Sequence, residues 1–480
     1  MRIIKRIAAA LLVVASTGLS ACQGIGDDDH SVVFWVSGGN ATTDLINNTL
    51  VPMFREEYAA EMPEDLEITV LSQGDYNGLY DAVSKAIPAG TTPTMAVAYP
   101  DHAASYVASN ALVDINTFID DEELTFTAEE GGGAEDFVKA FWDEGKNISG
   151  QEGLYTVPLY KSTEVMYFNR SYFHEHNLKI PTTWDELIEV ARTIHDSNPE
   201  YWNQPEHYPV IWDSDSNLFI THAYQMGYDY TDPTQTANPF VFNNEGNRNF
   251  VKELKGYYDG HLFATKGSLG GQYSSSFLTT EQCIIAIGST GGSTYNITPN
   301  FQLGIAPEPV FNTENAAYIQ QGPDVCFFRR SSETELEWGW RFYRFLTSTL
   351  TNYRICSTLS YNPVRYSSYE LDQYQDYVSQ YAAFVDEPLA TDSEGNLLHV
   401  DSNNMGLQSM VAYQTQKIVQ ANQLFYSPAF LGSAEARGDE TTGVGNVIAG
   451  TLTYTGSDID GQIMNLMNVA VNNALMAYTE

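Results

Sequence analysis

Short apolar runs that resemble strands alternate with segments of helical spacing near the start of the chain, and this alternation restricts the fold more than any other feature. Residues 31–36, 66–71 and 95–99 are rich in β-branched, aromatic or other apolar residues, and each precedes polar or glycine residues. Strands that alternate with helices favour a mostly parallel sheet flanked by helices, the α/β class. Ligands in such folds bind beyond the carboxyl ends of the strands. The segments at those ends are residues 37–39, 74–77 and 99–102.

A second constraint is the stretch Gly153–Arg170, where two apolar runs meet at a short polar break. Residues 155–159 alternate between apolar and polar as in a strand, and residues 165–168 form an apolar run typical of a strand covered on both faces. Lys161–Glu164 separate the two runs. Such a break can be a simple turn, and it is also a candidate binding site.

The segment after this break predicts a helix start, with Thr183 as N-cap and Glu186 as its capping-box partner. The ordered pieces Gly-Leu-Tyr-Thr-Val-Pro, Lys-Ser-Thr, Met-Tyr-Phe-Asn-Arg and Pro-Thr-Thr-Trp-Asp-Glu-Leu resemble the family 1 extracellular solute-binding proteins of ABC importers. The likeness continues through residues 318–322, 333–346 and 361–365. It implies a periplasmic-binding-protein-like fold with two hinged lobes, each a mostly parallel sheet flanked by helices, and a ligand cleft between them.

Within this family the chain looks most like the glycerol-3-phosphate-binding subgroup and its sugar-binding relatives. The resemblance implies an Arg that binds phosphate, matched here by Arg437, and an acidic residue that binds hydroxyls, matched by Asp101, with Pro100 as a competing alignment. If Arg437 does not reach the cleft, a neutral sugar is the expected ligand. The residues that would line the cleft are Tyr76, Asp101, Ser162, Ser289, Gly322, Tyr361 and Arg437.

The first residues are typical of a secretory signal. Basic residues precede an apolar run, and the sequence Leu-Ser-Ala-Cys ends it at Cys22. This ending resembles a bacterial lipobox, which implies cleavage before Cys22 and acylation of its thiol. Because one acyl chain anchors weakly, more than one chain is expected there. The protein is then expected outside the cytoplasm, held to the cell membrane by lipid, in the periplasm or on the outer surface.

After a 21-residue signal, the remaining residues are too many for one core, so two lobes are expected. The acidic, glycine-containing start of the mature chain is expected to be a flexible tether. The expected divisions are 1–21 signal peptide, 22–31 tether, 32–150 first lobe, 151–288 second lobe, 289–350 return to the first lobe, and 351–480 second lobe with cleft-closing C-terminal helices.

The chain is strongly acidic, with 23 Lys and Arg against 61 Asp and Glu, a net charge of −38. Such a chain repels nucleic acid and anionic headgroups at long range, so nucleic acid is not an expected partner. An anionic ligand would need donors placed close to it, because salt screens the wider field beyond about 10 Å.

No motif predicts a metal site or a cofactor. Asp213, Asp215 and Asn217 match the start of a calcium loop, but Leu218 stands where that loop requires glycine. Three cysteines remain after Cys22, an odd number that argues against a full disulfide framework. They are expected to be buried inert thiols, with one bridge as the open alternative; they are Cys283, Cys326 and Cys356.

The sequence therefore predicts a lipid-anchored, monomeric, non-enzymatic binding protein. By the resemblance, it captures a sugar or glycerol-3-phosphate by closure of the lobes and delivers it to ABC permease subunits. Two alternatives remain open. A surface-anchored carbohydrate-active hydrolase would use paired carboxylates whose separation a sequence does not show, and an adhesive surface protein would have no small-molecule site.

Overall fold

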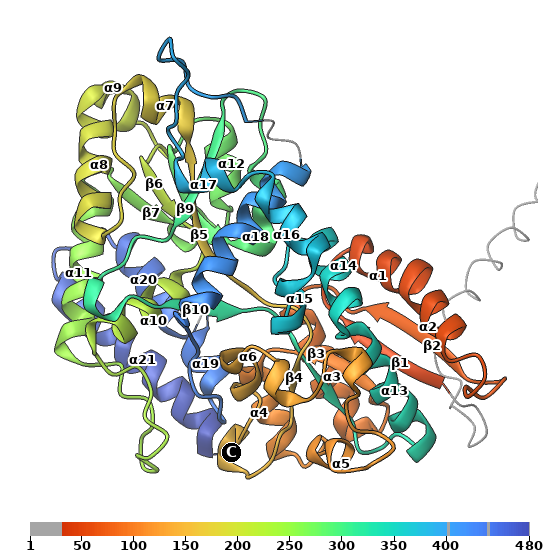
Figure 1. Cartoon of the computed structure of the whole chain (residues 1–480). Coiled ribbons are helices and arrows are strands. Elements are labelled where there is room, and N and C mark those ends of the chain that lie inside the picture. Colours follow the sequence, from red (N-terminus) through yellow and green to blue (C-terminus); the bar gives the residue numbers. More distant parts are fainter. Residues whose placement is uncertain (1–30, 401–403, 439–441, 480) are drawn as a thin grey trace, which may run out of the picture.

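The computed structural model describes residues 31–400, 404–438 and 442–479. The predicted signal peptide and Cys22 lie outside these residues. Two lobes, each built on its own β-sheet, lie side by side (Figure 1). No helix within the described ranges is both long and apolar enough to cross a membrane.

The first lobe surrounds a sheet in which β1 pairs in parallel with β2 and β3, while β11 runs antiparallel between β3 and β4. In spatial order its strands are β2 (Glu67–Ser72), β1 (Ser31–Val36), β3 (Met95–Ala98), β11 (Asp324–Phe327) and β4 (Val157–Pro158). The helices of this lobe are α1 (Asn40–Leu45), α2 (Val51–Glu57), α3 (Tyr76–Ala89), α4 (Pro100–Ala108), α5 (Asn116–Ile119), α6 (Lys139–Asp143), α13 (Glu333–Leu346), α14 (Thr349–Leu359), α15 (Tyr366–Glu370) and α16 (Asp372–Ser379).

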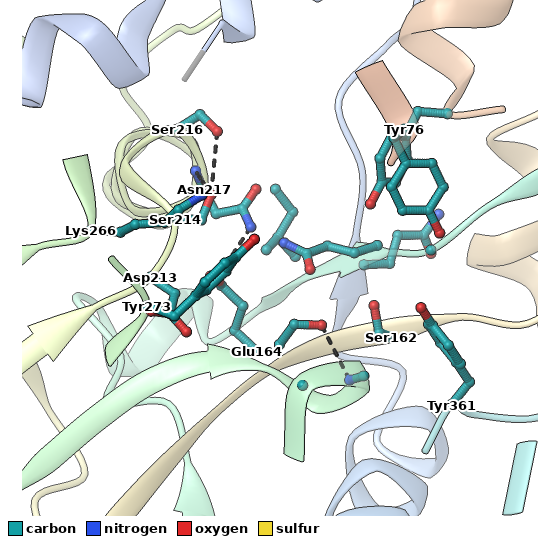
Figure 2. Close-up of a pocket in the computed structure, with 18 of the residues that line it drawn as sticks. Tyr76, Ser162, Glu164, Asp213, Ser214, Ser216, Asn217, Lys266, Tyr273 and Tyr361 are labelled. Atoms are coloured by element: carbon teal, nitrogen blue, oxygen red, sulfur yellow. Dashed lines mark hydrogen bonds between the residues drawn. The ribbon is translucent and has the colours of Figure 1, made fainter. Parts of the chain in front are cut away.

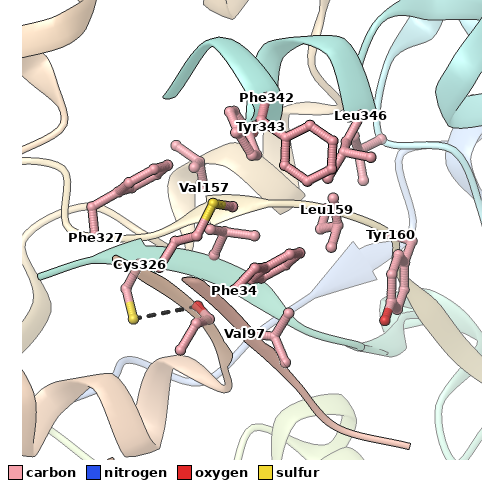
Figure 3. Close-up of a cluster of buried hydrophobic side chains, with 14 of the residues drawn as sticks. Phe34, Val97, Val157, Leu159, Tyr160, Cys326, Phe327, Phe342, Tyr343 and Leu346 are labelled. Carbon is pink, nitrogen blue, oxygen red and sulfur yellow. Dashed lines mark hydrogen bonds between the residues drawn. The ribbon is translucent and has the colours of Figure 1, made fainter. Parts of the chain in front are cut away.

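The core of the first lobe forms where the sheet meets α13. Figure 3 shows Phe34, Val97 and Phe327 from three strands together with Tyr343 of α13. The Cys326 thiol in this core donates to the carbonyl of Ala96 over 3.5 Å. The three described cysteines are free and buried, which confirms the prediction of buried thiols over a bridge among them.

The second lobe surrounds β5, which runs antiparallel to β8, β9 and β10, whereas β6 pairs in parallel with β7 and β8. Its strands are β5 (Ser162–Asn169), β6 (Val210–Trp212), β7 (Phe263–Thr265), β8 (Ile285–Ser289), β9 (Leu303–Pro307), β10 (Tyr318–Gln321) and β12 (Leu424–Phe425). Its helices are α7 (Arg170–Glu175), α8 (Trp184–Ser197), α9 (Pro199–Trp202), α10 (Asp215–Met226), α11 (Glu245–Asp259), α12 (Ser274–Thr279), α17 (Ala382–Asp386), α19 (Ser433–Arg437), α20 (Val444–Leu452) and α21 (Ile459–Thr479). The α/β class and the two-lobed architecture agree with the sequence prediction.

The lobe boundaries differ from the expected divisions. The strand β4 at 157–158 still belongs to the first sheet, so the chain enters the second lobe near residue 161 rather than 151. Both β9 and β10 pair with β5, so the return to the first lobe comes near residue 322 rather than 289. Residues 351–379 pack on the first core, not the second.

The helix α18 (Asn404–Gln420) spans the junction of the lobes. Ala412 and Val419 pack in the core of the first lobe. Leu407 and Met410, on the same helix, pack with β5 and β9 residues of the second lobe. The helix therefore provides an apolar support behind the crossing strands (Figure 1).

Residues 120–136 are mostly exposed or half-buried, as their acidic, glycine-rich sequence indicates, but the segment is held to the first lobe by carboxylates that pair with arginines. Glu130 is 7% exposed and Arg344 of α13 is 3% exposed, and Arg344 donates to both Glu130 carboxylate oxygens over 2.8 to 3.1 Å. Asp136 pairs in the same way with the buried Arg365, at 3.2 Å. These carboxylates anchor the segment to α13 and to the residue that precedes α15, both far along the chain.

Candidate functional site

A cavity of about 660 Å³ lies between the two lobes. Its volume falls within the roughly 300 to 1,000 Å³ that small-molecule sites occupy. The seven residues predicted from the resemblance all lie on its wall: Tyr76, Asp101, Ser162, Ser289, Gly322, Tyr361 and Arg437. Their binding role stays a prediction, but the fold brings them together.

Tyrosine rings form one end of the cavity. The Tyr76 ring lies 4.3 Å from the Tyr99 ring, and Tyr361 lies 4.4 Å from Tyr160, centroid to centroid. Tyr76 begins α3, whose N-cap Asp75 accepts from the Gly78 amide, and this cap sets the place of the ring. Burial raises the pKa of Tyr361, so its hydroxyl stays protonated and can both donate and accept.

The polar break Lys161–Glu164 splits between two faces because successive residues of a strand point to opposite sides. Ser162 and Glu164 lie on the cavity wall. Thr163 points away and donates to the Ile319 carbonyl over 2.8 Å. Ser162 and Glu164 therefore line the site, while Thr163 joins β5 to β10 within the second lobe.

Lys161 is a hinge residue that supports the cavity from behind. It is fully buried, and its ammonium lies 2.6 Å from Asp324 Oδ1 and 3.4 Å from Glu144 Oε2. Burial opposes the charge of Lys161, but the two carboxylates outweigh it and raise its pKa. Burial also raises the pKa of Glu144 to about 8, although Lys161 opposes this shift. Glu144 reaches the cavity wall, so this ion cluster links the site to the hinge.

Gly322 lies where the second crossing segment passes the first. Its φ is 100°, and a Cβ there would meet the Tyr160 carbonyl at 2.7 Å and Lys161 Cα at 2.9 Å. Such a position favours glycine, because other residues rarely adopt this conformation. The structure thus gives Gly322 a backbone role at the hinge as well as a place on the wall.

Two further carboxyls, Glu164 and Asp213, come from the second lobe (Figure 2). Glu164 accepts from Trp212 Nε1 over 3.4 Å and from Asn217 Nδ2 over 3.2 Å. Burial raises the pKa of Glu164 to about 8 and that of Asp213 to about 6. Behind them Glu308 is 1% exposed, and its carboxyl oxygens have no hydrogen-bond partner among the described residues. Burial, followed by the Glu164 charge, raises the pKa of Glu308 well above its usual value.

Arg437 reaches the cavity, but its guanidinium already has partners. Its Nη1 lies 3.7 Å from Asp101 Oδ2 of the first lobe, and its Nη2 donates to Asn217 Oδ1 of the second lobe. Ser289 also has a local role, because its Oγ accepts from the Gly291 amide over 3.2 Å and caps the short helix Thr290–Asn296.

Sequence reasoning missed several residues of the wall. Asp213 and Ser214 follow β6 directly, so the strand-end rule applied to residues 99–102 would have found them. Glu164 lay within the singled-out break and was not chosen. Glu144, Lys266, Tyr273 and Tyr295 carry no local signal, because the tertiary fold alone brings them to the site.

A family model described as bacterial extracellular solute-binding protein matches residues 54–382, more than half of the chain. No curated protein matches the chain in sequence.

Solved structures share the whole architecture at low identity. UgpB from Mycobacterium tuberculosis, in complex with glycerophosphocholine, is 16% identical, with a TM-score of 0.68 over 93% of this chain and 99% of its own. The GacH receptor of Streptomyces glaucescens is 14% identical, with a TM-score of 0.64 over 93% and 97%. The sugar-binding protein MalE from Xanthomonas citri is 14% identical, with a TM-score of 0.67 over 93% and 98%. These likenesses bear on the fold, and the family match covers most of the segments that build the cavity, with Tyr426, Ser427 and Arg437 beyond it. The chain belongs to the bacterial extracellular solute-binding proteins.

Proposed function

We propose that this protein is the substrate-binding component of an ABC importer and that it captures a neutral saccharide between its lobes. The observation that carries the proposal is the composition of the cavity wall, where tyrosine rings lie opposite carboxyl, hydroxyl and amide groups. Carboxylates accept from sugar hydroxyls, and aromatic rings cover the apolar faces of sugar rings. Tyr273 and Tyr295, which are 58% and 76% exposed at this wall, are suited to such stacking.

The charges of the wall favour a neutral ligand over a phosphate. A phosphate that bound Arg437 would have to displace Asp101, its present partner. It would also meet Asp213, whose carboxyl is largely ionised at neutral pH, whereas Glu144 and Glu164, with pKa values of about 8, are mostly protonated there. Like charges at close range in a low-dielectric site are strongly unfavourable. The carboxylates of Asp101 and Asp213 on the wall therefore support a sugar rather than glycerol-3-phosphate.

Both ligand classes occur on this fold. UgpB was solved with glycerophosphocholine, whereas T. maritima MalE3 was solved with maltose. The choice for this chain consequently rests on its own cavity. We further propose that acylation of Cys22 holds the protein at the membrane beside permease subunits, and that a monomer acts as the receptor.

Calorimetric titration of the purified protein tests the proposal. The panel is glucose, maltose, cellobiose, mannobiose, glycerol-3-phosphate and glycerophosphocholine. We expect a saccharide to bind and the two phosphate esters not to bind. Tyr361→Ala should weaken the saccharide by about 5- to 150-fold, because it removes packing and a hydrogen bond worth about 1 to 3 kcal/mol. Tyr366→Ala, at an exposed tyrosine outside the wall, is the matched control.

Other outcomes would contradict the proposal in distinct ways. Binding of glycerol-3-phosphate that disappears in Arg437→Ala would replace the saccharide with a polyol phosphate. Release of a shorter sugar from any glycoside in the panel would show a hydrolase instead of a receptor.

A further inference from the structure

A side chamber of about 260 Å³ adjoins the main cavity within the second lobe. The two spaces share Asp213 and Lys266 in their walls. Figure 2 shows these two side chains beside Tyr273, at the end of the cavity opposite Tyr76 and Tyr361. The chamber therefore lies next to the main cavity, on the side away from Tyr76 and Tyr361.

Glycines leave the chamber open. Gly270 and Gly271 have φ values of 70° and 84°, and a Cβ on either would meet nothing within 4 Å. On the opposite side, a Cβ at Gly267 would lie 2.7 Å from Ala449 Cβ, so α20 packs tightly against this loop and closes the chamber. Asp215 fixes the loop by accepting from the Gly267 amide over 2.9 Å.

The shared wall offers a donor and an acceptor together. The Lys266 ammonium lies 4.4 Å from the centroid of the Tyr273 ring, and within the described part of the chain it makes no ion pair or hydrogen bond. Asp213 is held by the Ser274 amide, which donates to its Oδ1 over 2.6 Å. An ammonium beside a carboxyl group matches the neighbouring hydroxyls of a sugar ring, one of which accepts while the other donates.

The size of the chamber suits one sugar ring. An apolar cavity of about 150 Å³ holds a benzene ring, so about 260 Å³ has room for a six-membered ring with hydroxyl substituents. On the same scale the main cavity, at about 660 Å³, has room for a disaccharide.

We propose that the side chamber is a further binding subsite, which takes a sugar unit beyond the disaccharide in the main cavity. The ligand is then a neutral oligosaccharide of at least three units, and Lys266 positions its distal ring. This inference rests on the proposed function, since it extends the same site.

The test compares disaccharides with trisaccharides of matched linkage: maltose with maltotriose, cellobiose with cellotriose, and mannobiose with mannotriose. Calorimetry on the full-length mature protein should show a trisaccharide that binds about tenfold or more tightly than its disaccharide, the gain expected from one charge-assisted hydrogen bond. Ala449→Leu fills the chamber and should reduce the trisaccharide affinity to that of the disaccharide. Ala108→Leu, at an exposed alanine at the end of α4, should leave both affinities unchanged.

A second variant keeps the test informative if Ala449→Leu does not fold. Lys266→Gln removes the ammonium at a half-buried position and should also lower the trisaccharide affinity, while the melting temperature of each variant reports its folding. Equal affinities within every pair that binds, or an Ala449→Leu variant that keeps the full trisaccharide gain, would overturn the subsite and leave the receptor intact. If no saccharide of either length binds, the proposed function fails and the subsite fails with it.

Discussion

Arg437 and Asp101 form an ion pair across the two lobes, with Nη1 3.7 Å from Oδ2. Arg437 ends α19 in the second lobe and Asp101 lies in the first turn of α4 in the first lobe. Arg437 also donates to Asn217 of α10, so the pair is fixed from the side of the second lobe. The contact therefore joins the lobes directly, at the wall of the cavity.

Loss of this pair should shift the lobes toward an open arrangement. A partly exposed pair contributes up to about 1 kcal/mol, so Asp101→Asn should lower the ratio of closed to open protein by at most about fivefold. Small-angle scattering should show a larger radius of gyration for the variant at low salt, and added NaCl should reduce the difference by screening. Lys252→Gln breaks an ion pair to Asp460 within the second lobe and is the control. A radius that rises equally in both variants would contradict a specific role for the cross-lobe pair.

Stability should depend on pH through Glu164. Burial raises its pKa in the folded protein from 4.5 to about 8, against the Trp212 and Asn217 donors. Between these values the folded protein holds a proton that the unfolded chain has released, so the free energy of unfolding falls as pH rises. Urea unfolding should show a slope up to about 1.4 kcal/mol per pH unit shallower in Glu164→Gln than in wild type. Glu189→Gln, at an exposed position on α8, should follow wild type. An unchanged slope in Glu164→Gln would assign the titration to another group.

The buried pair of Glu130 and Arg344 should be important for stability. Glu130→Gln leaves the Arg344 charge buried without its partner, which costs about 3 to 5 kcal/mol. Glu129→Gln changes the exposed neighbour and should have little effect. Urea unfolding of both variants measures the difference. Replacing Arg344 with Met in the Glu130→Gln background should restore part of the loss, because no charge then remains buried. Equal stability of the Glu129 and Glu130 variants would refute the argument.

The proposed lipid anchor predicts a change of location. Cys22→Ser removes the thiol that acylation requires, so the variant should move from the detergent phase to the aqueous phase on partitioning of whole cells. Replacement of Cys356, a buried thiol, with Ser is the control for loss of a cysteine and should remain with the detergent. Partitioning that does not change in Cys22→Ser would exclude this anchor.

The elements that depend on local pattern were predictable. The first strand occupies the residues expected from the sequence, 31–36, and the capping box of Thr183 and Glu186 is present. The pairing of β11 between β3 and β4 was not predictable, because no local pattern says which strands become neighbours. The same reason explains the acidic segment at 120–136, since the partner of Glu130 lies 214 residues further along the chain.

Some residues of the candidate site could be predicted from the sequence and others could not. The residues named from the resemblance all reach the cavity wall, because ordered motifs carry information about the whole fold. Lys266 and Glu144 have no such motif, and they reach the wall through loops whose course depends on distant contacts. Once β5 is known to begin at Ser162, strand geometry explains why the Ser162 side chain faces the cavity while the Lys161 side chain points away from it.

Because β11 lies between β3 and β4, the first sheet can be completed only after residues 324–327 have been synthesised. While the ribosome has made only residues 31–160, β3 has an open edge and β4 has none of its described pairing, because both await residues 324–327. An open edge can pair with other chains, so the nascent first lobe remains prone to aggregation until the second lobe has been translated. For the same reason a fragment ending near residue 160 is not a folding unit. An isolated first lobe requires a gene that joins residues 31–160 to 322–379 by a new linker.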